Sequence, residues 1–140
     1  MKTIVLISCV SKKRENKSQA KDLYCSPLFK KNLHYAESLK PDSIYILSAL
    51  YGLVDLKKEI EPYDKTLNDM SKKENLLWAD EVLQQLKKVA DLQNDKFVFL
   101  AGNNYRKNLL PHIAHYSIPM EGLQIGKQLE WLTERLKNVT

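Results

Sequence analysis

The chain has 140 residues, of which 44% are hydrophobic and 28% are charged, and its 22 Lys and Arg against 17 Asp and Glu give a net charge of +5. This composition is typical of a soluble globular protein, and the length predicts a single domain over residues 1–140. No apolar run approaches the roughly 18 residues of a membrane span, which excludes a transmembrane protein. A strand is predicted directly after Lys2, with no signal-peptide cleavage pattern, so we expect a cytoplasmic protein without a membrane partner.

The cysteine and histidine content argues against a metal centre. Cys9 and Cys25 are the only cysteines, and in a cytoplasmic protein we expect two reduced thiols. No Cys or His pair has the spacing of metal ligands, so no metal site and no cofactor is predicted. The sequence makes no prediction of the oligomeric state.

The first half of the chain contains two predicted strands and one helix. The β-branched run Thr3–Ser8 predicts a strand that is buried on both faces, as in a parallel sheet. Ser26 and Pro27 are typical of a helix start, and Pro41 ends that helix. The second strand is predicted at residues 43–48.

The segment after the second strand is the most unusual stretch. About 20 residues precede the next predicted helix, whereas loops in compact domains usually have roughly 4–6. Its aromatic and aliphatic residues argue against disorder. We therefore expect this loop to form one wall of a functional site.

The second half contains two further strands and helices. Ser71 and Glu74 have the spacing of a capping box and begin the longest predicted helix. Its predicted buried stripe is Leu76, Ala79, Leu83, Leu86 and Ala90. The third strand is predicted at 96–101, a weak fourth at 116–118, and an amphipathic helix at Ile125, Leu129, Leu132 and Leu136.

This alternation of strands and helices predicts an α/β fold, a three-layer sandwich with a mostly parallel four-stranded sheet flanked by helices. In such sheets ligands bind beyond the carboxyl ends of the strands. The unusual residues of this chain lie at those ends, whereas the opposite ends carry plain turn residues. The residues singled out are Ser8, Cys9, Ser11, Lys12, Lys13, Ser48, Tyr51, Gly52, Asp55, Tyr63, Asp64, Gly102, Asn103, Asn104, Tyr105, Arg106, Glu121, Gly122 and Gln124.

The segment from Ser8 to Lys13 favours a phosphate ligand, because it combines hydroxyls, backbone N–H groups and two ammonium groups after a strand. It lacks the glycines of a Walker loop or a dinucleotide motif. The alternative is an ordinary solvated basic loop. Cys9 is either a nucleophile beside Lys12 and Lys13 or a small buried hydrophobe.

The long loop offers a stacking platform and a carboxylate. Gly52 predicts a turn beside Tyr51, which either stacks on a base or caps the core. Tyr63 and Asp64 either position a water or stabilise an oxocarbenium-like sugar, as in glycosidic cleavage, or serve as ordinary packing and turn residues. Glu121 is the second candidate carboxylate.

The third loop, with Gly102, Asn103, Asn104, Tyr105 and Arg106, places amides and a guanidinium at a predicted helix start. This combination suits an anion or the edge of a base. The alternative is that Arg106 pairs with Asp55 or Glu121 without any ligand.

The chain resembles a family of small uncharacterised bacterial and phage domains over almost its whole length. The segments that carry this resemblance are residues 8–13, 23–26, 46–54, 60–64 and 101–102. The Tyr-Gly-Leu at 51–53 with the later Ile-x-Pro-Tyr at 60–63 is also similar to the YaaA peroxide-stress proteins, and more remotely to the uracil-DNA-glycosylase-like fold. The resemblance implies a nucleotide or nucleic-acid site, with DNA binding in the YaaA group.

Together these observations predict a protein that binds a nucleotide or nucleic acid, and whose activity as an enzyme would be to cleave or exchange an N-glycosidic bond. In this hypothesis Lys12, Lys13 and Arg106 hold phosphate. Tyr51 and Tyr63 stack on the base, and Asp64 or Glu121 acts at the anomeric carbon. The alternative is a binder without catalysis, either a DNA-binding stress protein or a phage-type module that sequesters a nucleotide.

Overall fold

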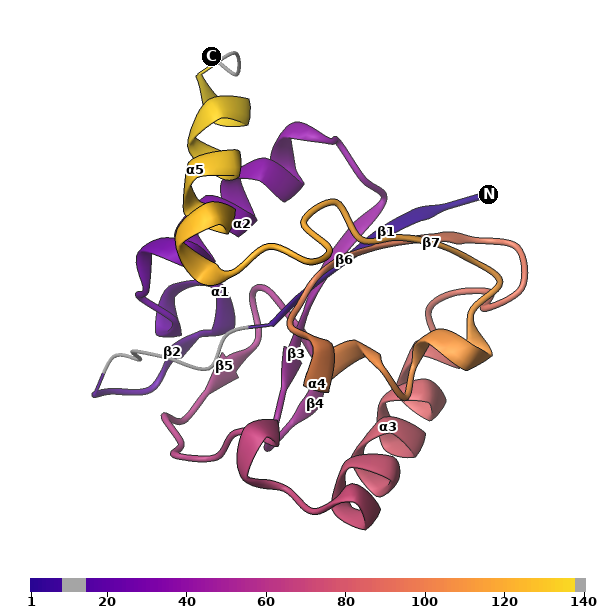
Figure 1. Cartoon of the computed structure of the whole chain (residues 1–140). Coiled ribbons are helices and arrows are strands. Elements are labelled where there is room, and N and C mark those ends of the chain that lie inside the picture. Colours follow the sequence, from indigo (N-terminus) through magenta and orange to yellow (C-terminus); the bar gives the residue numbers. More distant parts are fainter. Residues whose placement is uncertain (9–14, 138–140) are drawn as a thin grey trace.

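The structure is a computed structural model that describes residues 1–8 and 15–137 (Figure 1). Its elements follow in the order β1 (Thr3–Ser8), β2 (Ser18–Gln19), α1 (Ala20–Leu23), α2 (Pro27–Ser38), β3 (Ser43–Ser48), β4 (Gly52–Asp55), β5 (Glu59–Ile60), the 3₁₀ helix η1 (Leu67–Asp69), α3 (Lys72–Lys87), β6 (Lys96–Leu100), α4 (Asn103–Arg106), the 3₁₀ helix η2 (Leu110–His112), β7 (His115–Ser117) and α5 (Ile125–Leu136). None of the described helices is both long enough and apolar enough to cross a membrane.

The main sheet has five strands in the order β4-β3-β1-β6-β7. β3, β1, β6 and β7 run parallel, and β4 runs antiparallel to β3. The predicted α/β class with a mostly parallel sheet is confirmed, whereas the predicted number of four strands is wrong. The additional strand, β4, comes from the segment that was predicted to be a loop.

The turn at Gly52 explains this additional strand. Gly52 has φ +75°, a conformation in which a side chain is strained, so the chain reverses directly after β3. β4 then pairs with β3, with Val54 opposite Ile46. Both side chains are buried in the same cluster. Because alternate residues of β4 reach the core, this segment forms the edge strand of the sheet and is not an open loop.

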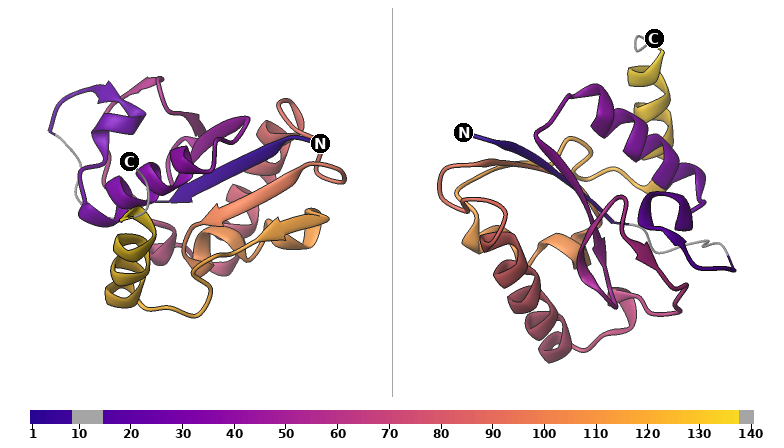
Figure 2. Two further views of the ribbon diagram at one scale, coloured as in Figure 1. Left: turned by 90° about the horizontal axis from the view of Figure 1, so that it is seen from above. Right: turned by 180° about the vertical axis from the view of Figure 1, so that it is seen from behind.

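Helices pack on both faces of the sheet, and Figure 2 shows α3 on one side and α2 with α5 on the other. In β1, Ile4 and Leu6 pack in the cluster with α3, while Val5 and Ile7 pack in the cluster with α2 and α5. The predicted two-sided burial of β1 is therefore confirmed. The predicted regular three-layer sandwich does not match in detail, since β2 and β5 form a separate two-stranded sheet.

Helix α3 begins at the predicted capping box, in which Glu74 N donates to Ser71 Oγ and Ser71 N donates to Glu74 Oε1. Its predicted stripe is wrong at Leu76, which is 47% exposed. The buried stripe instead includes Trp78, whose Nε1 donates to the Ser48 carbonyl at 2.9 Å. This hydrogen bond turns the indole toward the sheet and leaves Leu76 toward solvent.

At the amino end of β1, carboxylates bind the backbone. Thr3 N donates to Asp42 Oδ2 at 2.7 Å, and Lys2 N donates to Asp95 Oδ1 at 2.7 Å. Asp91 N also donates to Asp95 Oδ2. At this end of the strands, opposite to the predicted site, polar side chains therefore form structural hydrogen bonds.

We expect Gly52→Ala to lower the free energy of unfolding. The positive φ and the overlap of a new Cβ with the Gln85 side chain together cost about 1–3 kcal/mol. Gly126→Ala is the matched control, because a Cβ at Gly126 in α5 meets no atom within 4 Å. Urea unfolding of both variants measures the difference, and equal stabilities would contradict the account of the turn.

We expect Asp95→Asn to reduce stability at neutral pH but much less at acid pH. Hydrogen bonds from the backbone N–H groups of Asp91 and Lys2 lower the pKa of Asp95 from its ordinary 3.8. A lowered pKa in the folded state stabilises the protein above the ordinary pKa, and this contribution is lost as the pH falls through the folded-state pKa. Thermal unfolding from neutral to acid pH should show the two proteins converging, and a gap that persists at acid pH would contradict this.

Candidate functional site

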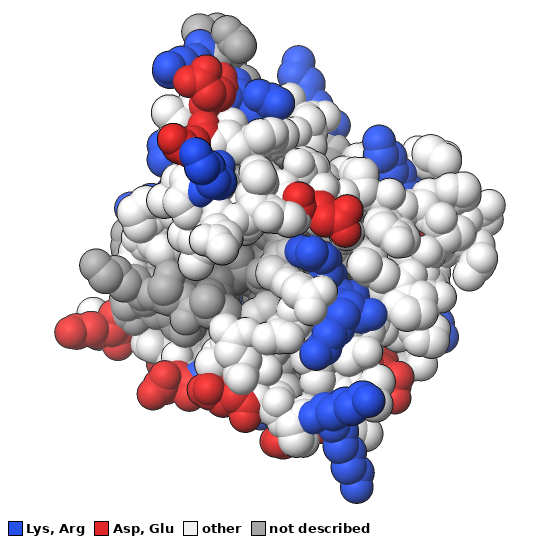
Figure 3. All heavy atoms as spheres, viewed as in Figure 1, with Lys and Arg blue, Asp and Glu red and all other residues white. Residues whose placement is uncertain are grey.

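A cavity of about 430 Å³ lies at the carboxyl ends of β1 and β6. Its described walls come from the ends of these strands, the start of α2, helix α4, the start of α5 and one residue of η1. The lining residues are Ser8, Ser26, Pro27, Leu28, Phe29, Asn32, Asn68, Leu100, Ala101, Gly102, Asn103, Asn104, Tyr105, Ile125, Gln128 and Leu129. In Figure 3 the uncharged surface between α4 and the start of α5 is hollowed.

The described lining is uncharged, since it contains no Lys, Arg, His, Asp or Glu. Its polar groups are carboxamides and hydroxyls, set between apolar side chains such as Leu28, Phe29 and Leu129. Apolar walls with a few directed polar groups are typical of small-molecule sites, and the volume lies in the usual range of roughly 300–1,000 Å³. The arrangement suits a ring system with a hydrogen-bonding edge.

Local hydrogen bonds place two hydroxyls at the cavity. Ser26 caps α2 and accepts a bond from Phe29 N at 3.2 Å, while Phe29 is anchored in the core. Ser8, the last residue of β1, accepts a bond from Gly102 N at 3.2 Å. This second bond joins the ends of β1 and β6, so the floor of the cavity is held by the sheet.

Asn32 is the unusual residue of the lining. It lies on the buried face of α2 between Phe29 and Ala36, and its side chain is only 2% exposed. Its Oδ1 accepts no hydrogen bond from the residues that the structure describes. A buried acceptor without a partner costs about 1–3 kcal/mol. The oxygen itself is enclosed by the surrounding packing, although other atoms of Asn32 belong to the cavity lining.

Carboxamides also hold the wall formed by α4. Asn104 Nδ2 donates to Asn68 Oδ1 at 2.7 Å, which connects α4 to η1. Asn75 Nδ2 donates to the Asn104 carbonyl at 3.0 Å, and Asn108 Nδ2 donates to Asn75 Oδ1 at 2.8 Å. This chain of amides ties α3, α4 and η1 together without any charged group.

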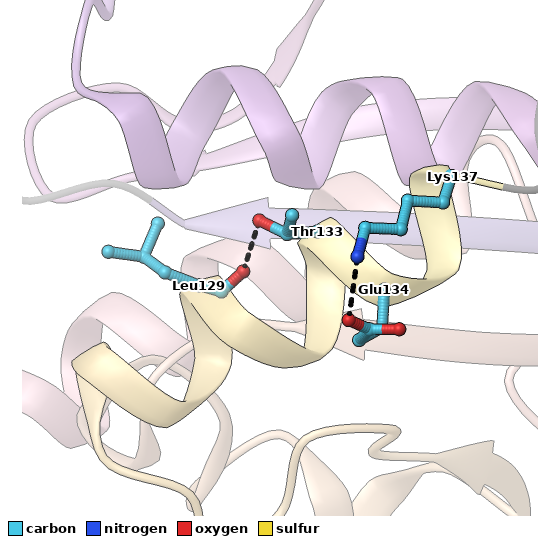
Figure 4. Close-up of polar contacts among 4 residues, drawn as sticks. All are labelled: Leu129, Thr133, Glu134 and Lys137. Carbon is cyan, nitrogen blue, oxygen red and sulfur yellow. Dashed lines mark hydrogen bonds and ion pairs between the residues drawn. The ribbon is translucent and has the colours of Figure 1, made fainter.

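The first turns of α5 form the opposite wall through Ile125, Gln128 and Leu129. Gln128 Nε2 donates to the Leu123 carbonyl at 2.8 Å. Further along α5, Thr133 Oγ1 donates to the Leu129 carbonyl and Lys137 pairs with Glu134 (Figure 4). This ion pair lies on the helix away from the residues that line the cavity.

The structure brings Ser48, Tyr51 and Tyr63 together in a cluster of their own. Ser48 Oγ donates to Tyr63 Oη at 2.9 Å, and Tyr24 Oη lies 2.5 Å from Tyr63 Oη. The ring of Tyr51 meets that of Tyr63 edge to face. These residues form a hydrogen-bonded cluster at the carboxyl end of β3, and none of them is among the described lining residues of the cavity.

The remaining predicted residues divide into three groups. Gly102, Asn103 and Tyr105 line the cavity with Ser8. The carboxylates of Asp64 and Glu121 are exposed and do not belong to the described lining, whereas Gly52 forms the β3–β4 turn. Cys9, Ser11, Lys12 and Lys13 lie outside the described residues.

Arg106 binds the backbone next to the cavity. Its Nη1 donates to the Ala101 carbonyl at 2.6 Å. The described part of the chain shows no ion pair of Arg106 with Asp55 or Glu121, so the ligand-free pairing considered from the sequence is not found. The guanidinium instead fixes the turn between β6 and α4.

Sequence reasoning named Asn104 with the third loop but missed Ser26, Asn32 and Gln128 as lining residues. Ser26 was recognised only as a helix cap. Asn32 carried a signal, because a polar residue one turn after Phe29 and before Ala36 interrupts an apolar stripe. Gln128 carried none, because polar residues on amphipathic helices are usually solvated.

A comparison with protein families finds one family that covers almost the whole chain. Residues 4–134 match DUF6884, a family of unknown function. The chain belongs to this family. Membership agrees with the predicted resemblance to an uncharacterised domain family, while the similarity to YaaA and to the glycosylase-like fold stays a hypothesis. No curated protein matches the sequence.

We expect Asn32→Leu to raise the free energy of unfolding of the ligand-free protein by about 1–3 kcal/mol, because it removes a buried acceptor without a partner. Asn75→Leu is the matched control. Asn75 is equally buried, but both its amide atoms are hydrogen-bonded, so the same change should destabilise. Urea unfolding measures both, and a loss of stability in Asn32→Leu similar to that in Asn75→Leu would contradict the assignment.

Proposed function

We propose that the protein binds a nucleotide, with the base and sugar in the cavity at the ends of β1 and β6. The observation that carries this proposal is an uncharged cavity of about 430 Å³ whose lining combines apolar side chains with carboxamides and hydroxyls. A nucleoside combines flat apolar faces with an edge of hydrogen-bonding groups. Proteins bind such groups by apolar contact and by bonds to the base edge.

The phosphate is assigned from the sequence. Ser8 lines the cavity, and Lys12 and Lys13 follow it along the chain, outside the described residues. In this proposal their ammonium groups bind the phosphate of the nucleotide. The nucleotide would then have its uncharged part in the uncharged cavity and its anionic part beside the basic segment.

The distribution of charge favours a free nucleotide over a duplex. In Figure 3 basic side chains gather over α4 and the start of α3, while acidic side chains gather over β5 and the segment after it. Exposed acidic residues of that segment are Glu59, Glu61, Asp64 and Asp69. A duplex-binding surface needs a continuous basic face, because its affinity comes mainly from phosphate contacts. The mixed charge of the face shown in Figure 3, on which the hollow lies, suits a small ligand better than a duplex.

Binding without catalysis fits the geometry better than N-glycosidic cleavage. Cleavage needs a carboxylate at the anomeric carbon, and neither Asp64 nor Glu121 is among the described lining residues. The hydroxyl of Tyr63 is engaged with Ser48 and Tyr24. The similarity to YaaA and to the glycosylase-like fold supports a nucleotide ligand in this proposal, but not a reaction.

We expect a nucleoside 5′-monophosphate to raise the melting temperature. A ligand at 100 times its Kd stabilises by about 2.7 kcal/mol, which corresponds to roughly 5–10 °C for a chain of this size. AMP, GMP, CMP and UMP should be compared with orthophosphate and with single- and double-stranded oligonucleotides. Gly102→Leu should abolish the shift, because Gly102 lines the cavity with open space at its Cβ position, whereas Gly126→Leu should retain it.

No shift with any of the four nucleotides would contradict the proposal, and a shift with duplex alone would replace it with duplex binding. The same mixtures can be tested for released base by chromatography. We expect none. Released base that disappears in Asp64→Asn would establish the glycosidase alternative instead.

A further inference from the structure

We infer that the bound nucleotide carries a second phosphate group, which binds in a basic pocket between η1, the first turn of α3 and the end of α4. This inference rests on the proposed function and extends it by naming the class of nucleotide, one with a phosphate on both the 5′ and the 3′ oxygen of the sugar. It follows from the position of the pocket beside the cavity and from the charge of its walls.

The basic pocket shares a wall with the cavity. It has a volume of about 360 Å³, and its described lining includes Asn68 and Asn104, which also line the cavity. The hydrogen bond from Asn104 Nδ2 to Asn68 Oδ1 at 2.7 Å joins these two side chains and is exposed. The cavity and the basic pocket therefore meet at one pair of carboxamides, and a ligand in the cavity can extend across this pair.

The walls of the basic pocket are charged, whereas those of the cavity are not. Lys72, the first residue of α3, and Lys107, directly after α4, belong to its described lining, which contains no Asp or Glu. Asp69 and Glu74 are close in sequence but lie outside this lining, and Glu74 accepts a bond from Ser71 N. Neither lysine forms an ion pair within the described part of the chain. Two ammonium groups without a carboxylate partner suit a phosphate.

The frame of the basic pocket is held by hydrogen bonds that involve no ligand. The buried side chain of Asn75 in α3 donates to the Asn104 carbonyl and accepts from Asn108 Nδ2. These bonds connect the helices that carry Lys72 and Lys107. A site whose walls are fixed in advance loses less conformational freedom when it binds a ligand.

The two phosphates are assigned to different walls of the cavity. The first lies beyond Ser8 at the end of β1, and the second lies across Asn68 and Asn104, which come from η1 and α4. In Figure 3 the basic side chains over α4 and the start of α3 lie on the same face as the hollow. A nucleoside in the cavity can direct its 5′ and 3′ oxygens to these two walls. This chemistry is shared by a free nucleoside 3′,5′-bisphosphate and by a nucleotide within a short single strand.

The test is calorimetric titration of nucleoside 5′-monophosphates, 5′-diphosphates and 3′,5′-bisphosphates of the four bases, and of 5′-phosphorylated dinucleotides. We expect a bisphosphate or a dinucleotide to bind roughly 10-fold more tightly than the 5′-monophosphate, as for two exposed charge contacts. Lys72→Gln and Lys107→Gln should each reduce this preference roughly 3-fold. Lys73→Gln is the matched control, because it removes the same charge from the next residue, outside the described lining, and should leave the preference unchanged.

The outcomes separate this inference from the proposed function. If none of these nucleotides binds the wild-type protein, the proposed function fails and the inference fails with it. Only the inference is overturned if monophosphates and bisphosphates bind equally, if the 5′-diphosphate is preferred to the bisphosphate, or if Lys73→Gln has the same effect as Lys72→Gln and Lys107→Gln.

Tighter binding of the bisphosphate than of the dinucleotide would support the inference with a free nucleotide as the ligand, and the reverse would support it with a single strand. The melting temperature of each variant without ligand shows whether it is folded. The two lysine variants test the pocket independently, because Lys72 and Lys107 belong to different helices.

Discussion

The burial of β1 on both of its faces is the constraint on which the rest of the structure depends. Its residues alternate between the cluster under α3 and the cluster under α2 and α5, while its backbone pairs with β3 and β6. A strand enclosed in this way has no freedom of register, because a shift of one residue would exchange the two faces. Its last residue, Ser8, is therefore held at one place, and this place is the cavity floor.

The two ends of β1 use polar side chains in opposite ways. At the amino end Asp42 and Asp95 accept backbone N–H bonds and are fully engaged in structure. At the carboxyl end, Asn32 is buried beside a cavity with its Oδ1 unpartnered among the described residues. Buried carboxamides elsewhere, such as Asn75, are satisfied within the fold. The contrast separates Asn32 from Asn75, although both are buried carboxamides on helices.

Where the sequence-based predictions were wrong, a long-range contact overrode a local pattern. The segment after β3 contained the signals of a loop, but Gly52 allows a reversal and Val54 then finds the core through β4. Leu76 has the spacing of a buried residue, but the bond from Trp78 to Ser48 turns another face of α3 toward the sheet. Tyr63 and Ser48, both candidate site residues from the sequence, bond to each other, and Tyr63 also bonds to Tyr24; neither belongs to the described lining of the cavity.

The sequence by itself determined the α/β class, the central strands β1, β3 and β6, the capping box of α3 and the edge of the sheet at which unusual residues collect. These features depend on short-range periodicity and on the chemistry of helix ends, both of which are encoded within a few residues. Only the tertiary structure decided that Ser8, Asn32, Gly102 and Gln128 share one cavity. It also decided that Asn32 is without a partner in the described chain, because hydrogen bonding and burial depend on which distant segments pack together.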